Sequence, residues 1–292
     1  MTALTVPATP SETARVFLDG IRVPVVFSVH SRFSRALNLQ HTDGRLLLTV
    51  SDASLGGAPL GIVASMPPGV ALNKEATGAS ASFDGARLAL GPVVLEVSRG
   101  PGYRVTFPVP EGKAWWSPAR LESELAAAAR AGHDKAPGLG AFPARAEESR
   151  PARLWEDRLG EVTARLAGGN APTAFEAALG LLGLGPGLTP SGDDLLVGFL
   201  AATGTPWSAD GSRELLQRAN TATTLISYNY ILHALERRFS TLVGALLGAL
   251  WTGPDEAVRE NLRALLRAGA TSGRDTIRGL VAGLRRREHA GG

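Results

Sequence analysis

The residues with the clearest chemical potential lie in one glycine-rich stretch, residues 183–194, which reads Gly-Leu-Gly-Pro-Gly-Leu-Thr-Pro-Ser-Gly-Asp-Asp. Alternate glycines allow the backbone of a loop to come close to a ligand. The apolar run at residues 195–200 is typical of a helix, and the free N–H groups at a helix start attract anions. The stretch therefore predicts an anion site, above all for phosphate.

The polar side chains of this stretch extend the prediction. Asp193 and Asp194 supply carboxylates that either hold Mg²⁺ beside a bound phosphate or act as a base. Helix-start chemistry is the alternative, because a Ser191 N-cap contributes about 1 kcal/mol and acids in the first turn about 0.3–1 kcal/mol. The catalytic candidates here are Asp193, Asp194, Ser191 and Thr189, and the anion-binding candidates are Gly185, Gly187 and Gly192.

A second copy of the pattern stands near the C-terminus, where residues 271–275 read Thr-Ser-Gly-Arg-Asp before another apolar run. If the two helix starts converge, they form one cup of donors, with Arg274 as a fork for a phosphate or carboxylate. Asp275 then joins Asp193 and Asp194 as an oxygen ligand for a metal. Chance recurrence of so short a pattern is the alternative. The copy adds Thr271, Ser272 and Gly273 to the anion-binding candidates.

Further polar candidates lie outside the two copies. Residues 221–230 are rich in hydroxyl groups, and Thr224 and Ser227 share one helical face there. They line a polar pocket unless capping and bonding to the helix backbone account for them. His30 ends a predicted strand and could project toward the helical domain, although a lone histidine is more often structural.

Composition excludes several classes of protein. The 292 residues include no cysteine, which rules out disulfides, thiolate metal sites and a cysteine nucleophile. The net charge is +3 and the arginines are scattered among acids, so we expect no nucleic-acid partner. There is neither a signal-peptide pattern nor an unbroken apolar run of about 18 residues, so we expect a cytoplasmic protein without membrane contact. P-loop, α/β-hydrolase and zincin motifs are missing from the sequence.

The predicted fold class is α+β, with an N-terminal antiparallel β-sheet or small barrel followed by a mostly helical C-terminal domain. The β-rich domain covers residues 1–112, with residues 1–12 poorly ordered and a short helix over residues 30–39. The strands are expected at residues 21–29, 45–50, 60–64, 80–83, 87–90, 93–97 and 103–109.

The helical domain covers residues 113–292 and carries the glycine-rich stretch. Its first helix opens at Ser117-Pro118, and residues 132–151 form a loop or linker. Further helices are expected over residues 152–167, 172–183, 192–203, 211–219, 222–250, 255–268 and 273–286.

Three strings together resemble a known family. They are Val29-His30-Ser31-x-Phe33-x-x-Ala36-x-Asn38, the middle string from Gly185 to Asp194, and Thr271-Ser272-Gly273-x-Asp275. The chain resembles the family of the H subunit of oxamate carbamoyltransferase, from anaerobic allantoin degradation. The resemblance adds His30 and Asn38 to the substrate-binding candidates. Arg274 and Arg278 make the last string more basic than the family pattern suggests.

The resemblance implies carbamoyl transfer, in which oxalurate and phosphate exchange with oxamate and carbamoyl phosphate, with partner subunits contributing. We therefore expect a carbamoyltransferase or a subunit of one, acting on a small anionic substrate, with Mg²⁺ as the cofactor and an oligomeric assembly. Two alternatives stay open. One is a Mg²⁺-dependent hydrolase of a phosphate or N-glycosidic substrate, and the other is a non-catalytic subunit of a multi-subunit enzyme.

Overall fold

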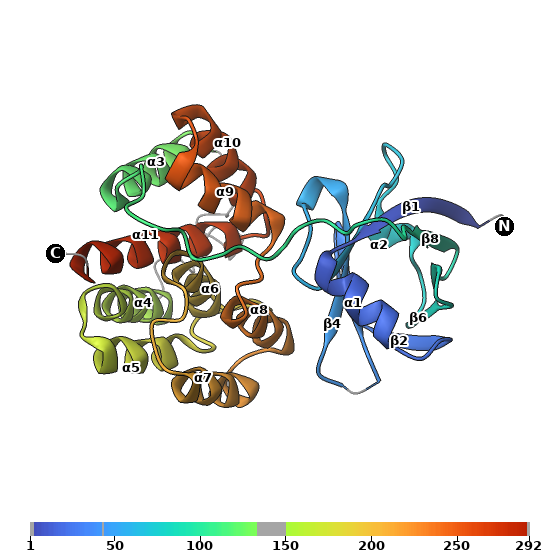
Figure 1. The fold of residues 1–292 in the computed structure, drawn as a ribbon, viewed down its shortest axis with the longest axis horizontal. Coiled ribbons are helices and arrows are strands. Elements are labelled where there is room, and N and C mark those ends of the chain that lie inside the picture. Colours follow the sequence, from blue (N-terminus) through green and yellow to red (C-terminus); the bar gives the residue numbers. More distant parts are fainter. Residues whose placement is uncertain (1–2, 43, 133–149, 291–292) are drawn as a thin grey trace. The chain divides into compact units, whose positions relative to one another are not determined.

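The computed structural model describes residues 3–42, 44–132 and 150–290. The chain forms two compact units, Met1–Thr106 with Arg238–Thr241, and Phe107–Arg237 with Leu242–Gly292 (Figure 1). Most of the linker predicted at residues 132–151 lies outside the described residues.

The first unit is a closed β-barrel with the strand order β1-β5-β4-β3-β2-β6-β7-β8. Two of its pairings, β1 with β8 and β4 with β5, are parallel and the others are antiparallel. The strands are β1 (Leu4–Pro10), β2 (Val25–Phe33), β3 (Ala36–Gln40), β4 (Leu47–Asp52), β5 (Gly61–Ala64), β6 (Ser80–Phe83), β7 (Arg87–Leu90) and β8 (Val93–Val97). The unit also contains α1 (Glu12–Gly20), the short helix η1 (Ala53–Leu55) and α2 (Leu72–Glu75).

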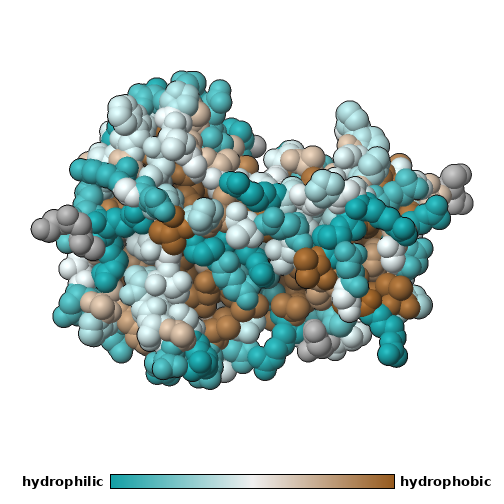
Figure 2. All heavy atoms as spheres, viewed as in Figure 1, coloured by the Kyte–Doolittle hydropathy of each residue, from teal (hydrophilic) through white to brown (hydrophobic). Residues whose placement is uncertain are grey.

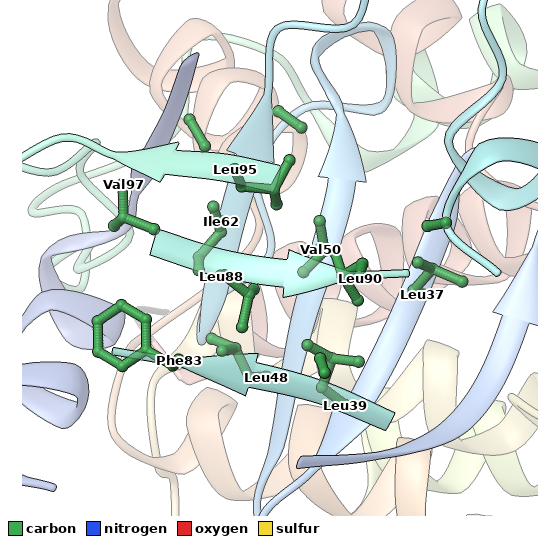
Figure 3. Packing of buried hydrophobic residues seen from close by; sticks show 14 of the residues in the cluster. Leu37, Leu39, Leu48, Val50, Ile62, Phe83, Leu88, Leu90, Leu95 and Val97 are labelled. Atoms are coloured by element: carbon green, nitrogen blue, oxygen red, sulfur yellow. The ribbon is translucent and has the colours of Figure 1, made fainter. Parts of the chain in front are cut away.

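The barrel is held together by apolar side chains that point inward from every strand. Alternate residues of a strand face opposite sides, so Leu37 and Leu39 of β3 both enter the core and are fully buried. Figure 3 shows them packed with Leu48, Val50 and Leu90 from other strands. The sequence forms a barrel because each short strand supplies its own apolar face to one shared interior.

The predicted fold class, with an antiparallel β-sheet or small barrel, is wrong as stated. The observed sheet is a closed barrel of mixed pairing, because β1 and β5 each join one parallel and one antiparallel neighbour. Strand-like sequence shows which segments are extended but not the direction of their neighbours. The parallel β1–β8 pairing joins strands distant in the sequence, and the parallel β4–β5 pairing joins consecutive strands through a connection that includes η1. Neither connection is a tight turn that residue types would announce.

Three local expectations for this unit are also wrong. Residues 30–39 form the hairpin of β2 and β3 rather than a helix, because Leu37 and Leu39 alternate inward as a strand requires. Residues 4–10 are the ordered strand β1, with Val6 and Ala8 buried. Residues 103–109 make only isolated bridges, from Tyr103 to Ser11 and from Thr106 to Arg238.

The second unit is built from helices on either side of α6 and α11. Figure 1 shows α11 passing between α3 and α4, both of which it contacts. The helices are α3 (Pro118–Arg130), α4 (Arg150–Gly168), α5 (Ala171–Leu181), α6 (Ser191–Thr203), α7 (Ala209–Ala222), α8 (Leu225–Leu235), α9 (Thr241–Thr252), α10 (Asp255–Leu266) and α11 (Ser272–Ala290).

The single helix predicted over residues 222–250 is wrong, since α8 ends at Leu235 and α9 begins at Thr241. Arg237 lies at this break with φ +62°, the left-handed region that rarely suits arginine. Its guanidinium donates to the carbonyl groups of Phe107, Leu200 and Ala201, which compensates for the unusual backbone. Burial, together with the charge of Arg287, lowers the pKa of Arg237 to about 10.

Helices α6 and α11 lie side by side and run in the same direction. Gly198 lies against residues 276 and 280, and Gly283 lies against residues 199 and 202. Residues nearer the C-terminal end of α6 contact residues nearer the C-terminal end of α11, which is the pattern of two parallel helices. The two helix starts are therefore brought to the same end of the pair, a prerequisite for the predicted cup.

Among the described residues no helix is long and apolar enough to span a membrane. Large apolar side chains that are exposed include Val16, Val26 and Trp115, whereas Trp116 is fully buried. Hydrophilic residues cover most of the face drawn in Figure 2, with hydrophobic residues in small groups between them.

Candidate functional site

The two Ser-Gly-x-Asp helix starts converge, which decides between the two possibilities that their repetition left open. Thr189 Oγ1, just before α6, lies 2.8 Å from Ser272 Oγ at the start of α11 in a hydrogen bond between the two copies. Parallel helices with adjacent starts place two positive dipole ends together. An acid stands in the first turn of each helix, Asp194 in α6 and Asp275 in α11.

The glycine-rich loop has the backbone that its sequence predicts. Gly183, Gly185 and Gly187 have φ values of +70°, +112° and +97°, a conformation that other residues rarely adopt. The loop is tied down at two places, where Gly192 N–H donates to Leu184 O at 2.8 Å and Thr224 Oγ1 donates to Leu188 O at 2.6 Å. Its tip, residues 186–188, is exposed.

Ser191 is not the N-cap of α6, contrary to the alternative based on helix-start chemistry. Pro190 occupies the cap position without a side-chain hydrogen bond, and Ser191 is the first helical residue. Its side chain is buried and lies close enough to Asp275 to lower the pKa of that carboxyl. Ser191 therefore contacts the partner helix rather than its own backbone.

Asp193 joins the loop to the starts of α6 and α8. The carboxylate accepts hydrogen bonds from Gly183 N–H at 2.9 Å and from the hydroxyl of Thr223. Only 1% of Asp193 is exposed, and burial raises its pKa, although the hydrogen bonds from Thr223 and Gly183 oppose the rise. Both carboxylate oxygens are thus used inside the protein, which favours a positioning role.

Asp194 and Asp275 differ from Asp193 because each has an unused oxygen. Oδ2 of Asp194 and Oδ2 of Asp275 are buried, and neither has a hydrogen-bond partner among the described residues. Leaving a buried acceptor without a partner costs about 1–3 kcal/mol. These two atoms are therefore candidate acceptors for hydrogen-bond donors from outside the chain.

The environment keeps these two acids from ionising readily. Burial raises the pKa of Asp194 well above its usual value, and the charges of Asp275 and Asp193 raise it further, against the nearby hydroxyls of Ser272 and Thr189. Burial also raises the pKa of Asp275, opposed by the Ser191 hydroxyl and by Arg274 and Arg278. A carboxyl with a raised pKa holds a proton more readily than an ordinary aspartate does, which makes both acids candidates for proton transfer.

The contacts across the helix pair are reciprocal. The hydroxyl of Ser191 in the first copy lies near Asp275 of the second, and the hydroxyl of Ser272 lies near Asp194 of the first. Such reciprocity arises when two elements are related by an approximate two-fold axis. Within Ser-Gly-x-Asp itself the copies differ at one position, where Asp193 in one copy corresponds to Arg274 in the other.

Two arginines flank the site on the α11 side. Arg278 Nη1 lies 3.4 Å and Arg274 Nε 3.7 Å from Asp275 Oδ1. The Arg274 side chain is 18% exposed and that of Arg278 is 45% exposed, so the pair connects the buried acid to solvent. They leave Asp275 Oδ2 unpartnered, because both lie on its other oxygen.

The backbone at both helix starts is already engaged in part. Gly192 and Gly273 are required for packing, because a Cβ atom would lie 2.1 Å from Leu181 O and 1.9 Å from Leu265 O respectively. Their N–H groups donate to Leu184 O and Ala268 O, and Asp275 N–H donates to Thr271 O. Hydroxyl and guanidinium groups are therefore the more accessible donors to a ligand.

The start of α8 forms one wall of the site. Thr224 is its N-cap and accepts a hydrogen bond from Ser227 N–H at 3.1 Å. The Ser227 hydroxyl is 2% exposed and makes no hydrogen bond of normal geometry with a described residue, yet it lies near enough to Asp193 to lower the pKa of that acid.

Sequence reasoning missed two residues of this wall, Thr223 and Tyr230. Thr223 bonds to Asp193, and burial together with the charge of Asp194 raises the pKa of Tyr230 to about 12. Both belong to the hydroxyl-rich run at residues 221–230. Tyr230 follows Ser227 by three residues, a spacing that places both on one helical face.

His30 and Asn38 belong to the barrel unit. His30 lies in the middle of β2, not at a strand end, and its Nδ1 lies 3.2 Å from Ser31 Oγ. Asn38 is buried, donates to Ser31 Oγ at 2.9 Å and accepts from Thr49 Oγ1 at 2.8 Å. These bonds within the barrel account for Asn38, and a substrate contact from either residue stays a prediction.

No group of three or more His, Cys, Asp or Glu side chains within the described residues is arranged to hold a metal ion. Asp193, Asp194 and Asp275 are thus not a preformed three-carboxylate site. The contacts of Asp193 explain this, since both of its oxygens are occupied by Gly183 and Thr223. Binding of Mg²⁺ stays a prediction.

The segment that contains both helix starts also carries the match to a known family. Residues 181–284 match the family of oxamate carbamoyltransferase subunit AllH. The match runs from the end of α5 through most of α11, so it includes the loop, both acids with unused oxygens and the α8 wall, and it confirms the resemblance noted in the sequence. No curated protein and no solved structure matches the chain significantly.

Proposed function

We propose that this chain is a carbamoyltransferase subunit whose helical unit binds the small substrate at the joined starts of α6 and α11. The observation that carries the proposal is the hydrogen bond between Thr189 and Ser272, which unites the two motifs inside the matched segment. Near that bond, Asp194 Oδ2 and Asp275 Oδ2 are buried without hydrogen-bond partners among the described residues. A purely structural motif would be expected to satisfy such atoms.

The reaction proposed is transfer of a carbamoyl group between phosphate and the amide nitrogen of oxamate. In one direction the oxamate nitrogen attacks the carbonyl carbon of carbamoyl phosphate, a C–N bond forms and the C–O bond to phosphate breaks. Phosphate leaves with the bonding electron pair, and the attacking nitrogen loses one proton. Oxalurate and phosphate are the products, and the reverse direction returns oxamate and carbamoyl phosphate.

Each proposed role follows from a contact. Asp194 takes the proton from the nitrogen, because its Oδ2 is free of partners and its pKa is raised by burial. The hydroxyls of Thr189 and Ser272 donate to the carbonyl oxygen, where negative charge develops. Arg274 binds the anionic end of the substrate from the partly exposed side, assisted by Arg278.

Asp193 acts indirectly in this scheme. It holds the loop start and Thr223 in place and so fixes the geometry around Asp194. Partner subunits are proposed from the name of the matched family, which is that of a subunit. Mg²⁺ would be bound together with substrate phosphate, because the described side chains do not form a metal site by themselves.

The test is calorimetric titration of the full chain with carbamoyl phosphate, oxamate, oxalurate and phosphate, each with and without Mg²⁺. We expect oxamate or carbamoyl phosphate to bind the wild type. Thr189→Val removes the hydroxyl that joins the helix starts and should weaken binding by about tenfold, while Thr252→Val on α9 should not. If none of the four compounds binds, the proposal is contradicted. If carbamoyl phosphate or oxalurate is hydrolysed in the absence of an acceptor, the hydrolase is favoured instead.

A further inference from the structure

Asp194 and Asp275 indicate which chemical group of the substrate the site recognises, an inference that rests on the proposed function. Asp194 Oδ2 and Asp275 Oδ2 are acceptors, both are buried, and neither has a partner among the described residues. Asp275 is 1% exposed, so water does not freely solvate its carboxyl group. A ligand that enters the site can supply the hydrogen-bond donors that these two oxygens lack.

The charge of the site limits which donors fit. The charges of Asp275 and Asp193 lie close enough to Asp194 to disfavour its ionisation, and Tyr230 from α8 contributes a neutral phenol. A second carboxylate or a phosphate placed between Asp194 and Asp275 would add to this repulsion. An amide or ureido group supplies N–H donors without adding negative charge.

Two neighbouring hydroxyl groups could bind the carbonyl oxygen of an amide or ureido group. Thr189 and Ser272 bear hydroxyls that can donate to a carbonyl oxygen, and both are only partly buried. A ligand that enters here exchanges the Thr189–Ser272 hydrogen bond for bonds to its own carbonyl group. Arg274 and Arg278 lie at Oδ1 of Asp275, where they can bind a carboxylate attached directly to the amide.

We propose that Asp194 Oδ2 and Asp275 Oδ2 are the acceptors for the N–H groups of the substrate, so that the site selects a neutral amide or ureido group and rejects a second anionic group at that position. The reciprocal arrangement of the two helix starts supports this assignment. An NH₂ group has two hydrogens to donate, and the approximate two-fold axis provides one acceptor on each side. Oxamate and oxalurate carry such a group, whereas oxalate carries a carboxylate in its place.

The first experiment uses wild-type protein and two ligands of nearly equal size. Calorimetric titration with oxamate and with oxalate compares an amide with a carboxylate at the same position. We expect oxamate to bind at least about tenfold more tightly, because a site built for N–H donors rejects an analogue that lacks them. Equal or tighter binding of oxalate overturns the inference. Tight binding of oxalate only in the presence of Mg²⁺ also overturns it, since the acids would then be metal ligands.

The second experiment uses Asp194→Asn and Asp275→Asn, which keep the shape of each side chain but replace one acceptor by a donor. Each variant should lower the ratio of oxamate to oxalate affinity by about tenfold, with oxalate binding unchanged or stronger. Asp210→Asn on α7 is the matched control, because its side chain is 86% exposed. An unchanged ratio in both site variants overturns the inference.

The outcomes separate this inference from the proposed function. If the wild type binds none of the ligands, the proposed function fails and the inference with it. If the wild type binds carbamoyl phosphate and oxamate but does not distinguish oxamate from oxalate, only the inference fails. If an Asn variant does not fold, the wild-type comparison of the two ligands still decides.

Discussion

Gly198 of α6 and Gly279 of α11 each lie against the backbone of the other helix. A Cβ atom on Gly198 would stand 2.0 Å from Thr276 O, and one on Gly279 would stand 1.9 Å from Leu195 O. These positions correspond in the two copies of the motif, so the same close approach is made twice. It fixes the separation of the helices only a turn beyond Asp194 and Asp275, and thereby the distance between the two acids.

Gly279→Ala should therefore destabilise the helical unit. The added methyl group cannot be placed without separating the helices, and overpacking of this kind costs about 1–3 kcal/mol. Gly248→Ala on α9 is the matched control, because nothing lies within 4 Å of its added Cβ, and it should stabilise by about 0.5–1 kcal/mol. Urea unfolding followed by tryptophan fluorescence measures both, since every tryptophan of the chain lies in the helical unit. A stable Gly279→Ala variant would contradict the close approach.

Asp193→Ala should loosen the glycine-rich loop. The change leaves Gly183 N–H and the Thr223 hydroxyl without their acceptor, and a buried donor left unpaired costs about 1–3 kcal/mol. Hydrogen exchange should show faster exchange at Gly183, which Asp210→Ala should leave unchanged. Unaltered protection of Gly183 would show that the loop does not depend on Asp193.

The glycine-rich site could be predicted in outline because its signals are local. Positive φ at Gly185 and Gly187 follows from residue type, and the shared Ser-Gly-x-Asp pattern indicated that Asp194 and Asp275 belong together. The different roles of the three acids could not be predicted. Asp193 is distinguished from Asp194 only by Thr223 and Gly183, which the fold brings to one of them and not to the other.

In the barrel, local residue patterns predict the turns but not the relative directions of the strands. Asp84-Gly85 forms the turn that its residue types favour, since Asp84 Oδ1 accepts from Ala86 N–H and Gly85 has φ +103°. The closure of the barrel depends on β1 lying parallel to β8. β1 is the first and β8 the last strand of the barrel along the chain, so no local residue pattern indicates their relative direction. The expectation of an antiparallel sheet was wrong at this pairing.

Asp194→Asn should change stability in a pH-dependent manner. The pKa of Asp194 is raised in the folded state, so folded protein holds this proton more tightly than unfolded protein does. The carboxyl group therefore favours folding below its unfolded pKa, and this contribution is lost as pH rises through the folded pKa. Asparagine cannot ionise, so the variant should exceed the wild type in stability at pH 8, by an amount that shrinks as pH falls toward about 4. Urea midpoints at a series of pH values measure the difference, and a constant difference would contradict the raised pKa.

Two glycines of the loop offer a paired test of its conformation. Gly183 and Gly187 both have positive φ, so alanine at either position costs about 1–2 kcal/mol in backbone strain. Only at Gly183 does the added Cβ also meet another atom, 2.1 Å away at Ala222 O, whereas the space around Gly187 is open. Gly183→Ala should therefore destabilise the helical unit more than Gly187→Ala, as measured by urea unfolding.

The Ala222 carbonyl that a Cβ on Gly183 would meet stands directly before Thr223. Gly183→Ala should therefore also disturb the Thr223–Asp193 contact and weaken oxamate binding, while Gly187→Ala should leave that contact in place. Equal effects of the two substitutions on stability would show that the loop start does not pack against the end of α7 as described.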